Sequence, residues 1–357
     1  LLPCFWYTAG MVSIAGRRWM LPRGAAILII GFLGTQWRPA FGQPIADRLG
    51  STHVAGRYHF TGDDYLHEGA TQILRAGMRT IKVYLSPGGY PFNSTWPPVF
   101  TSNVQMAQHP YYQALFNKPF KTYVMTCYST VDGNGNYWWF GINASQLAAE
   151  REQFYQLARH FLTTYNGTGK TFIFSHWEGD WSLRGTTNQS PEFDPPQSRC
   201  QFMIQWLNAR QDGVDQARAE VTDTDVKVYH APEMNLLNIA MQGRPTVTNN
   251  VLPFTHCDLV SCSAWDIVSG ANATHINNAL NYLASKMPDR PPYGNKNVYI
   301  GEFGWPEIAQ GTAWSTTVIK TGTQAALDWG CPWVIYWQIY DNECIADPAS
   351  NNDCQGY

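Results

Sequence analysis

The chain has 357 residues, of which 44% are hydrophobic and 14% charged, so it can bury a large core and is not of disordered composition. Its formal net charge is -3, and its lysines and arginines are scattered along the sequence. A basic surface of the kind that binds nucleic acid or an anionic membrane is therefore not expected. Length alone permits one large domain or two ordinary ones.

The first 42 residues have the pattern of an upstream and signal segment. Arg23 precedes an apolar run at residues 25–33, and the small residues of Ala40-Phe41-Gly42 suit a signal peptidase. We expect cleavage after Gly42, while residues 1–19 suggest no role. No run approaches the roughly 20 apolar residues that a membrane-spanning helix needs. The sequence predicts a secreted protein with no membrane attachment after signal cleavage.

Glycosylation sequons support secretion, since five Asn-x-Ser/Thr triplets follow the signal segment. They begin at Asn93, Asn143, Asn166, Asn188 and Asn272, and each is expected in or beside a loop. Seven cysteines follow as well, and this odd number leaves at least one thiol unpaired or intermolecular. Cys344 and Cys354 are expected to close the C-terminal tail by a disulfide, and Cys257 and Cys262 could close a small loop.

From about residue 54 onward, short β-rich runs alternate with longer helical runs. The expected strands are Val54–Phe60, Thr80–Leu85, Thr122–Tyr128, Thr171–His176, Val226–His230, Leu259–Ala264, Val298–Glu302 and Trp333–Gln338. The clearest helices are Asp64–Ala76, Ser145–Tyr165, Gln197–Ala219, Thr274–Met287 and Thr312–Trp329. Strands that alternate with helices pair in parallel through right-handed crossovers. Eight such units predict a single-domain α/β fold, a (β/α)8 TIM barrel, over residues 43–357.

The ends of the barrel strands are where chemistry is expected. The fourth expected strand leads into Glu178, and the seventh leads into Glu302. Two carboxyl groups facing each other across the mouth of a barrel suit glycoside hydrolysis, in which one protonates the leaving oxygen and the other attacks the anomeric carbon. Asp180 is a reserve for the acid, because it lies two residues after Glu178.

These residues resemble those of the clan A glycoside hydrolases. The run Gly301-Glu302-Phe303-Gly304-Trp305-Pro306 is similar to the corresponding run of plant and fungal endo-β-1,3-glucanases and of cellulase-type barrels. The resemblance implies a retaining mechanism, with Glu178 as acid/base and Glu302 as nucleophile. It also implies that Trp337 is the aromatic floor beneath the reacting sugar.

The sequence departs from the clan pattern at two points. Clan members usually have Asn immediately before the acid/base, where this chain has Trp177. The Tyr or His that often contacts the nucleophile is not obvious, although Tyr229, His230 or Trp265 could replace it. Orienting cations could come from Arg57, His59 or Lys82.

Other candidates for substrate binding surround the two glutamates. They are His176, which could shift the pKa of the acid, Glu233 after the fifth strand, Trp305, and the aromatics Trp96, Trp138, Trp139, Phe140 and Trp181. Aromatic planes pair well with sugar rings, although packing explains about half of such residues. These positions predict a carbohydrate as the partner.

No cofactor or metal is expected. The cysteine spacings match no zinc site, and Asp132-Gly-Asn134-Gly-Asn136 lacks the Glu that completes a calcium loop. The alternative to a glycosidase is a catalytically inactive barrel that binds carbohydrate or assembles outside the cell. A metal-dependent hydrolase is a weaker alternative because ligand clusters are not apparent. The oligomeric state, the sugar and its linkage do not follow from the sequence.

Overall fold

A computed structural model describes residues 43–53, 61–87, 100–133 and 135–340. Contacts divide the chain into Leu1–Arg38 and Pro39–Tyr357, and all of the described residues belong to the second unit. Within the described ranges, no helix is both long enough and apolar enough to cross a membrane.

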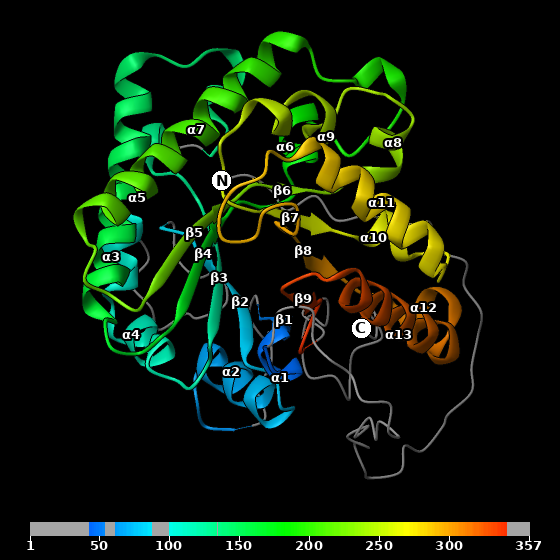
Figure 1. The fold of residues 1–357 in the computed structure, drawn as a ribbon, viewed down its shortest axis with the longest axis horizontal. Coiled ribbons are helices and arrows are strands. Elements are labelled where there is room, and N and C mark those ends of the chain that lie inside the picture. The colour runs from blue at the N-terminus through cyan, green and yellow to red at the C-terminus, as the bar shows by residue number, and fades with distance from the viewer. Residues whose placement is uncertain (1–42, 54–60, 88–99, 134, 341–357) are drawn as a thin grey trace. The chain divides into compact units, whose positions relative to one another are not determined.

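Nine parallel strands form one sheet that curls into a barrel (Figure 1). The order in the sheet is β5-β4-β3-β2-β1-β9-β8-β7-β6. The end strands β5 and β6 are separated in sequence only by Pro232, which has no N–H to donate and interrupts the ladder. The barrel closes there, since His230 O accepts hydrogen bonds from Asp258 N and Leu259 N, and Pro232 O accepts one from Ser261 N. The strands are β1 Leu49–Thr52, β2 Thr80–Leu85, β3 Thr122–Cys127, β4 Thr171–Ser175, β5 Lys227–Ala231, β6 Glu233–Met234, β7 Val260–Ser263, β8 Val298–Phe303 and β9 Val334–Tyr336.

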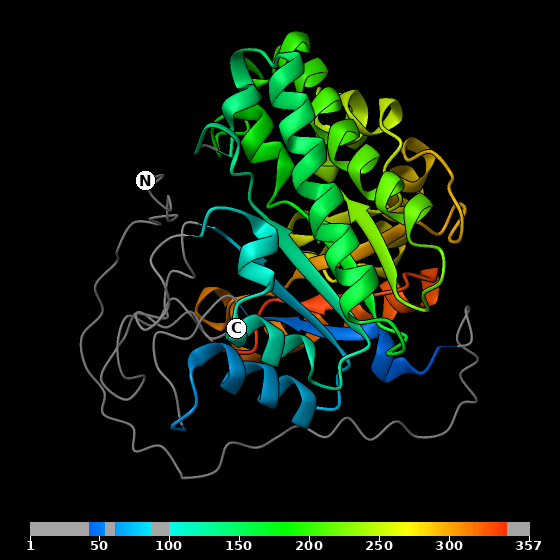
Figure 2. The same cartoon turned by 90° about the vertical axis from the view of Figure 1, so that its left-hand side faces the viewer.

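Helices surround the strands (Figures 1 and 2). They are α1 Ile45–Arg48, α2 Tyr65–Arg75, α3 Asn103–Ala107, α4 Pro110–Phe116, α5 Ala144–Thr164, α6 Gly179–Arg184, α7 Gln197–Glu220, α8 Leu237–Met241, α9 Val247–Asn250, α10 Trp265–Val268, α11 Ala273–Lys286, α12 Glu307–Gln310 and α13 Thr312–Trp329. The sequence sets several of their starts. Asp64 caps α2, and Asn143 and Gln146 form a capping box on α5. The fold is therefore the predicted single-domain (β/α)8 barrel.

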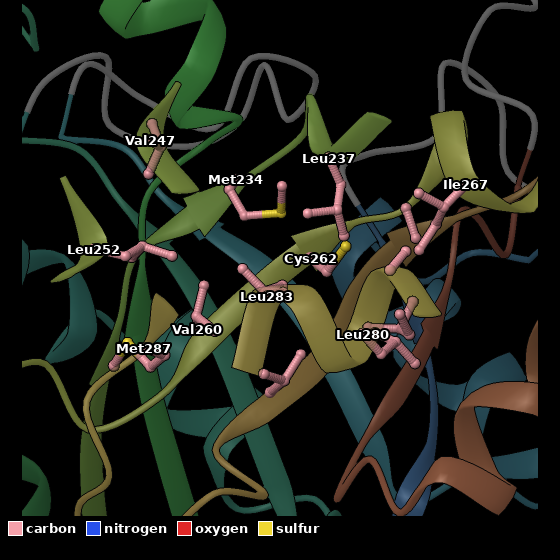
Figure 3. Close-up of a cluster of buried hydrophobic side chains, with 14 of the residues drawn as sticks. Met234, Leu237, Val247, Leu252, Val260, Cys262, Ile267, Leu280, Leu283 and Met287 are labelled. Carbon is pink, nitrogen blue, oxygen red and sulfur yellow. The ribbon is translucent and has the colours of Figure 1, made fainter. Parts of the chain in front are cut away.

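Both faces of the strands are buried, as expected for a parallel sheet. Outward residues of β6 and β7, such as Met234, Val260 and Cys262, pack on Leu237 of α8 and Leu280 of α11 (Figure 3). A separate cluster fills the barrel, formed by inward residues of five strands together with Leu259 and Trp333, which directly precede β7 and β9. The strand residues are Val124, Ile173, Tyr229, Ala231, Tyr299 and Ile335. Above this apolar layer the inward positions are polar, and they form the candidate site.

The position predicted for the first strand is wrong. The slot between β2 and β9 is filled by Leu49–Thr52, whereas Val54–Phe60 lies outside the described residues. Gly50 explains why this short strand gives a weak sequence signal. A Cβ at Gly50 would come within 2.7 Å of Thr80 O, so close pairing with β2 requires glycine, a residue that is depleted in strands.

The proposed disulfide between Cys257 and Cys262 is also wrong. Both thiols are free and buried, as are those of Cys127, Cys200 and Cys331. Cys262 lies on the outward face of β7, where its side chain serves as part of the apolar core. The predicted tail bridge between Cys344 and Cys354 lies outside the described residues.

Candidate active site

Glu302 lies on the inner face of β8 because the strand is irregular just before it. Ile300 and Phe303 both pack outward, and the register with β9 shifts between them. Glu302 is thereby turned inward and pairs in register with Ser263. Its Oε2 accepts a hydrogen bond from Lys82 Nζ at 3.3 Å, and its Oε1 accepts one from Trp265 Nε1 at 3.0 Å. Two donors therefore hold the carboxylate.

Glu178 follows β4 as the N-cap residue of α6. It has φ 28° and ψ 72°, an uncommon backbone conformation for a residue with a side chain. Its backbone N–H donates to Glu233 Oε1 at 3.1 Å, and its own Oε1 accepts from Ser263 Oγ at 2.8 Å. The side chain is buried, and among the described residues one donor contacts its carboxyl group, whereas two contact that of Glu302.

A third carboxylate, Glu233, lies between the other two. It is fully buried on β6, and its Oε2 accepts from Lys82 Nζ and from Ser261 Oγ, both at 2.8 Å. Lys82 also contacts Glu302, so one buried ammonium group bridges two carboxylates. The sequence-based view of Glu233 as a loop residue is corrected, because its side chain lies inside the barrel.

The electrostatics distinguish Glu178 from Glu302. Burial, together with the negative charge of Glu302, raises the pKa of Glu178 well above its usual value, and Ser263 opposes this only in part. Burial also raises the pKa of Glu302, but the positive charge of Lys82 and the N–H of Trp265 act against the shift. Burial lowers the pKa of Lys82, whereas the charges of Glu233 and Glu302 more than reverse that effect and leave it raised. Glu178 is thus the carboxyl group that more readily holds a proton.

Gly301 allows these groups to approach. A Cβ at this position would lie 1.8 Å from Ser261 Oγ and 3.0 Å from Glu233 Oε2. Any side chain at residue 301 would therefore displace the hydrogen bond between Ser261 and Glu233.

Two residues near Glu178 have roles other than those expected. His176 faces outward and stacks on Trp206 at 5.4 Å between ring centroids, and its Nδ1 accepts from Glu233 N. Burial lowers the pKa of His176 to about 3, so the ring is neutral and does not supply charge. Asp180 is fully buried and accepts hydrogen bonds from the backbone N–H groups of Asn235, Leu236 and Val247. These bonds attach Asp180 to the segment after β6 and to the start of α9, and its part as a reserve acid stays a prediction.

Tyr229 and His230 also lie away from the glutamates. Tyr229 is buried in the apolar layer and packs against Tyr293. His230 points outward toward Phe154. The contact that either was expected to make with Glu302 is made by Trp265.

The remaining predicted aromatics differ in how far they are exposed to solvent. Trp177 is 39% exposed beside Glu178, and Phe140 is 90% exposed after β3. Trp138, by contrast, is fully buried and stacks on Trp206. Trp337 is partly buried at the end of β9, and Trp305 packs partly into the core around α13. Trp96, Arg57 and His59 lie outside the described residues.

The sequence reasoning missed three residues of the site. Ser261 and Ser263 alternate on β7, and each donates to a glutamate. Tyr84 lies two residues after Lys82 on β2, and burial raises its pKa well above the usual value, with smaller contributions from Tyr128 and the three glutamates. The period-two alternation of each strand is a signal that could have identified all three.

The described ranges contain no group of three or more His, Cys, Asp or Glu side chains placed to hold a metal ion. Four of the sequon asparagines, Asn143, Asn166, Asn188 and Asn272, are exposed at helix caps or in loops, as expected, whereas Asn93 is not described.

Solved structures with the same fold were found by structural comparison. A family 5 xyloglucanase from Paenibacillus pabuli has a TM-score of 0.53 and 14% identity, over 88% of this chain and 93% of that one. A GH5-4 broad specificity endoglucanase from Clostridium acetobutylicum has a TM-score of 0.51 and 12% identity, over 89% and 94%. A family 26 endo-β-1,4-mannanase from Cellulomonas fimi has a TM-score of 0.51 and 11% identity, over 87% and 66%.

No protein-family model matches the sequence, and no curated protein matches it significantly. At 11 to 14% identity, the structural matches establish the fold alone. The chain shares the (β/α)8 barrel fold of these three glycoside hydrolase structures.

Proposed function

We propose that the protein is a retaining glycoside hydrolase that cleaves a β-linked poly- or oligosaccharide, with Glu178 as acid/base and Glu302 as nucleophile. The observation that carries the proposal is the unequal environment of two buried carboxyl groups at the ends of β4 and β8. Lys82 and Trp265 stabilise negative charge on Glu302, while burial favours the protonated form of Glu178. Pairs of carboxyl groups with this asymmetry divide the acid and nucleophile roles in glycoside hydrolysis.

In this mechanism Glu178 gives its proton to the leaving glycosidic oxygen while Glu302 attacks the anomeric carbon. The resulting glycosyl ester on Glu302 is then hydrolysed by a water molecule, which the ionised Glu178 deprotonates. The charge of Lys82 supports Glu302 as the attacking anion and again as the departing carboxylate. Trp337 and Trp177 would contact the sugar rings.

We also propose that the protein acts outside the cell as a glycoprotein. The signal-like pattern of residues 1–42 and the four exposed sequons support this part of the proposal. The similar structures include a xyloglucanase, an endoglucanase and a mannanase, which favours a β-linked glycan as the substrate class.

One observation favours a second candidate, a barrel that binds carbohydrate without cleaving it. Trp177 stands where clan members usually have Asn, and its indole ring cannot replace an amide that bonds the sugar 2-hydroxyl in both directions. Retention of glycan binding without turnover would support this candidate.

The two candidates are separated by assaying a panel of β-glucans, β-mannans, xylans and xyloglucan. The wild type should release reducing ends from at least one polymer, while Glu178→Ala and Glu302→Ala, each confirmed as folded by circular dichroism, should release none. Exposed Glu152 on α5 gives a matched control, and Glu152→Ala should retain activity. Binding without hydrolysis by the wild type would contradict the catalytic proposal.

A further inference from the structure

Glu233 is joined by hydrogen bonds to both proposed catalytic groups. Its Oε1 accepts from the backbone N–H of Glu178 at 3.1 Å, and its Oε2 accepts from Lys82 Nζ at 2.8 Å. Lys82 in turn donates to Glu302 at 3.3 Å. A continuous chain of hydrogen bonds therefore runs from the backbone of Glu178 to the carboxylate of Glu302.

The bond to Glu178 matters because of the backbone at that residue. A φ of 28° is strained for a residue with a side chain and persists only where its surroundings hold it. Glu178 N–H is buried and has Glu233 as its acceptor, and an unpaired buried N–H is unfavourable. This N–H bond is thus one of the contacts that fix the direction in which the side chain of Glu178 leaves the backbone.

The bond to Lys82 matters because of charge. Lys82 is fully buried and is the cation that faces Glu233 and Glu302 in the described part of the barrel. Its positive charge is divided between the two carboxylates, and the shorter contact goes to Glu233. Glu233 therefore weakens the electrostatic stabilisation that Lys82 gives to Glu302.

We propose that Glu233 is a positioning residue that fixes the backbone of the acid/base and, through Lys82, sets the charge environment of the nucleophile. This inference rests on the proposed function. Glutamine at this position would keep the acceptor for Glu178 N–H and lose the charge, whereas alanine would lose both. The two roles of Glu233 can therefore be tested separately.

Other titratable groups lie near this network. Tyr84 of β2 and Tyr299 of β8 lie beside it, while His176, which follows β4, and Cys262 of β7 lie on the outer side of the strands. They act in addition to Lys82, Glu178 and Glu302. Burial raises the pKa of Tyr84, Tyr299 and Cys262 and lowers that of His176, so all four are neutral between about pH 4 and 8. The changes expected on substitution of Glu233 thus come from the three glutamates and Lys82.

The first test compares Glu233→Gln and Glu233→Ala with the wild type through the pH dependence of kcat/KM. Removing the charge of Glu233 lowers the pKa of both Glu302 and Glu178, so both limbs of the profile should move to lower pH in Glu233→Gln, by about one unit. Glu233→Ala should also lose roughly 100-fold in kcat with a smaller change in KM, and glutamine should restore most of that loss. Glu152→Gln, an exposed substitution on α5, is the control and should leave the profile unchanged.

The second test does not need activity. With 13C-labelled glutamate, the carboxyl signal assigned to Glu302 should titrate at lower pH in Glu233→Gln than in the wild type. A crystal structure of Glu233→Ala should show that residue 178 has left positive φ. If the glycan panel shows no turnover but both changes appear, the proposed function fails and the positioning role stands.

Unchanged pH limbs and an unchanged Glu302 titration in Glu233→Gln would overturn the charge role. A Glu178 backbone that keeps its φ in Glu233→Ala would overturn the positioning role. Turnover by the wild type together with these results would leave the proposed function intact while refuting this inference.

Discussion

Trp265 donates its indole N–H to Glu302 Oε1 at 3.0 Å, and this bond completes the two-donor environment of the proposed nucleophile. Trp265 begins α10 two residues after the end of β7, so the segment that follows the strand paired with β8 supplies the donor. Its ring also packs near Gly304, where a Cβ would come within 3.1 Å of it. The bond therefore depends on a glycine in the same run that contains Glu302.

Trp265→Phe should keep most of the ring volume and remove this donor. We expect kcat to fall roughly 10- to 100-fold, because hydrogen bonds to charged groups contribute ~1.5–3 kcal/mol. The N–H lowers the pKa of Glu302, so its loss should move the acidic limb of kcat/KM to higher pH. An unchanged acidic limb would show that Glu302 is not the ionised group.

Ser263→Ala should affect the basic limb of the pH profile of kcat/KM. Ser263 Oγ donates to Glu178 Oε1 at 2.8 Å and lowers the pKa of this carboxyl group. Without the donor the pKa of Glu178 rises, so the general acid stays protonated to higher pH. The basic limb of kcat/KM should then move upward by up to about one unit. Ser285→Ala, on the exposed side of α11, is the control, and a downward shift in Ser263→Ala would contradict the assignment.

Glu178→Gln should become more stable than the wild type as the pH rises. The folded protein holds the Glu178 proton more tightly than the unfolded chain, so stability is highest below the unfolded value near 4.5 and falls as pH rises toward the folded pKa. Glutamine cannot ionise and avoids this loss. Thermal unfolding at about pH 8 should give a Tm at least ~2 °C above that of wild type, with little difference at about pH 4. If the variant and the wild type had equal Tm values at each of the two pH values, the raised pKa of Glu178 would be refuted.

Glu150 and Arg210 form a buried ion pair at 2.6 Å outside the barrel, between α5 and α7. Glu150→Leu should cost about 3–5 kcal/mol in chemical denaturation, because it leaves a buried guanidinium without its partner. The double variant Glu150→Leu with Arg210→Met should recover much of that loss. A double variant no more stable than the single one would show that packing, and not the unpaired charge, causes the effect.

The repeated βα pattern was enough to predict the barrel, and β2 and α13 have the predicted bounds. The positions of Glu178 and Glu302 at strand ends also followed from that pattern. The inward orientation of Glu302 did not, because regular alternation from Ile300 points residue 302 outward and only the irregular register reverses it. Such an irregularity arises from tertiary pairing and has no clear local signal.

Glu233 shows a different limit. Tyr229, Ala231 and Glu233 follow one inward alternation, but the expected strand ended at His230, before Glu233. The hydrogen bonds of Asp180 could not be foreseen because its three backbone donors come from residues 235, 236 and 247, far away in sequence. Long-range partners of this kind are decided by the closed barrel and not by the local sequence.

The most direct measurement is to identify the residue that becomes glycosylated during turnover. The protein would be treated with a panel of activated 2-deoxy-2-fluoro β-glycosides, digested, and mapped by mass spectrometry, with Glu302→Gln as the control. The account predicts a glycosyl ester on Glu302 in the wild type and none in the control. A label on another residue, or polysaccharide products first released with inverted anomeric configuration, would contradict it.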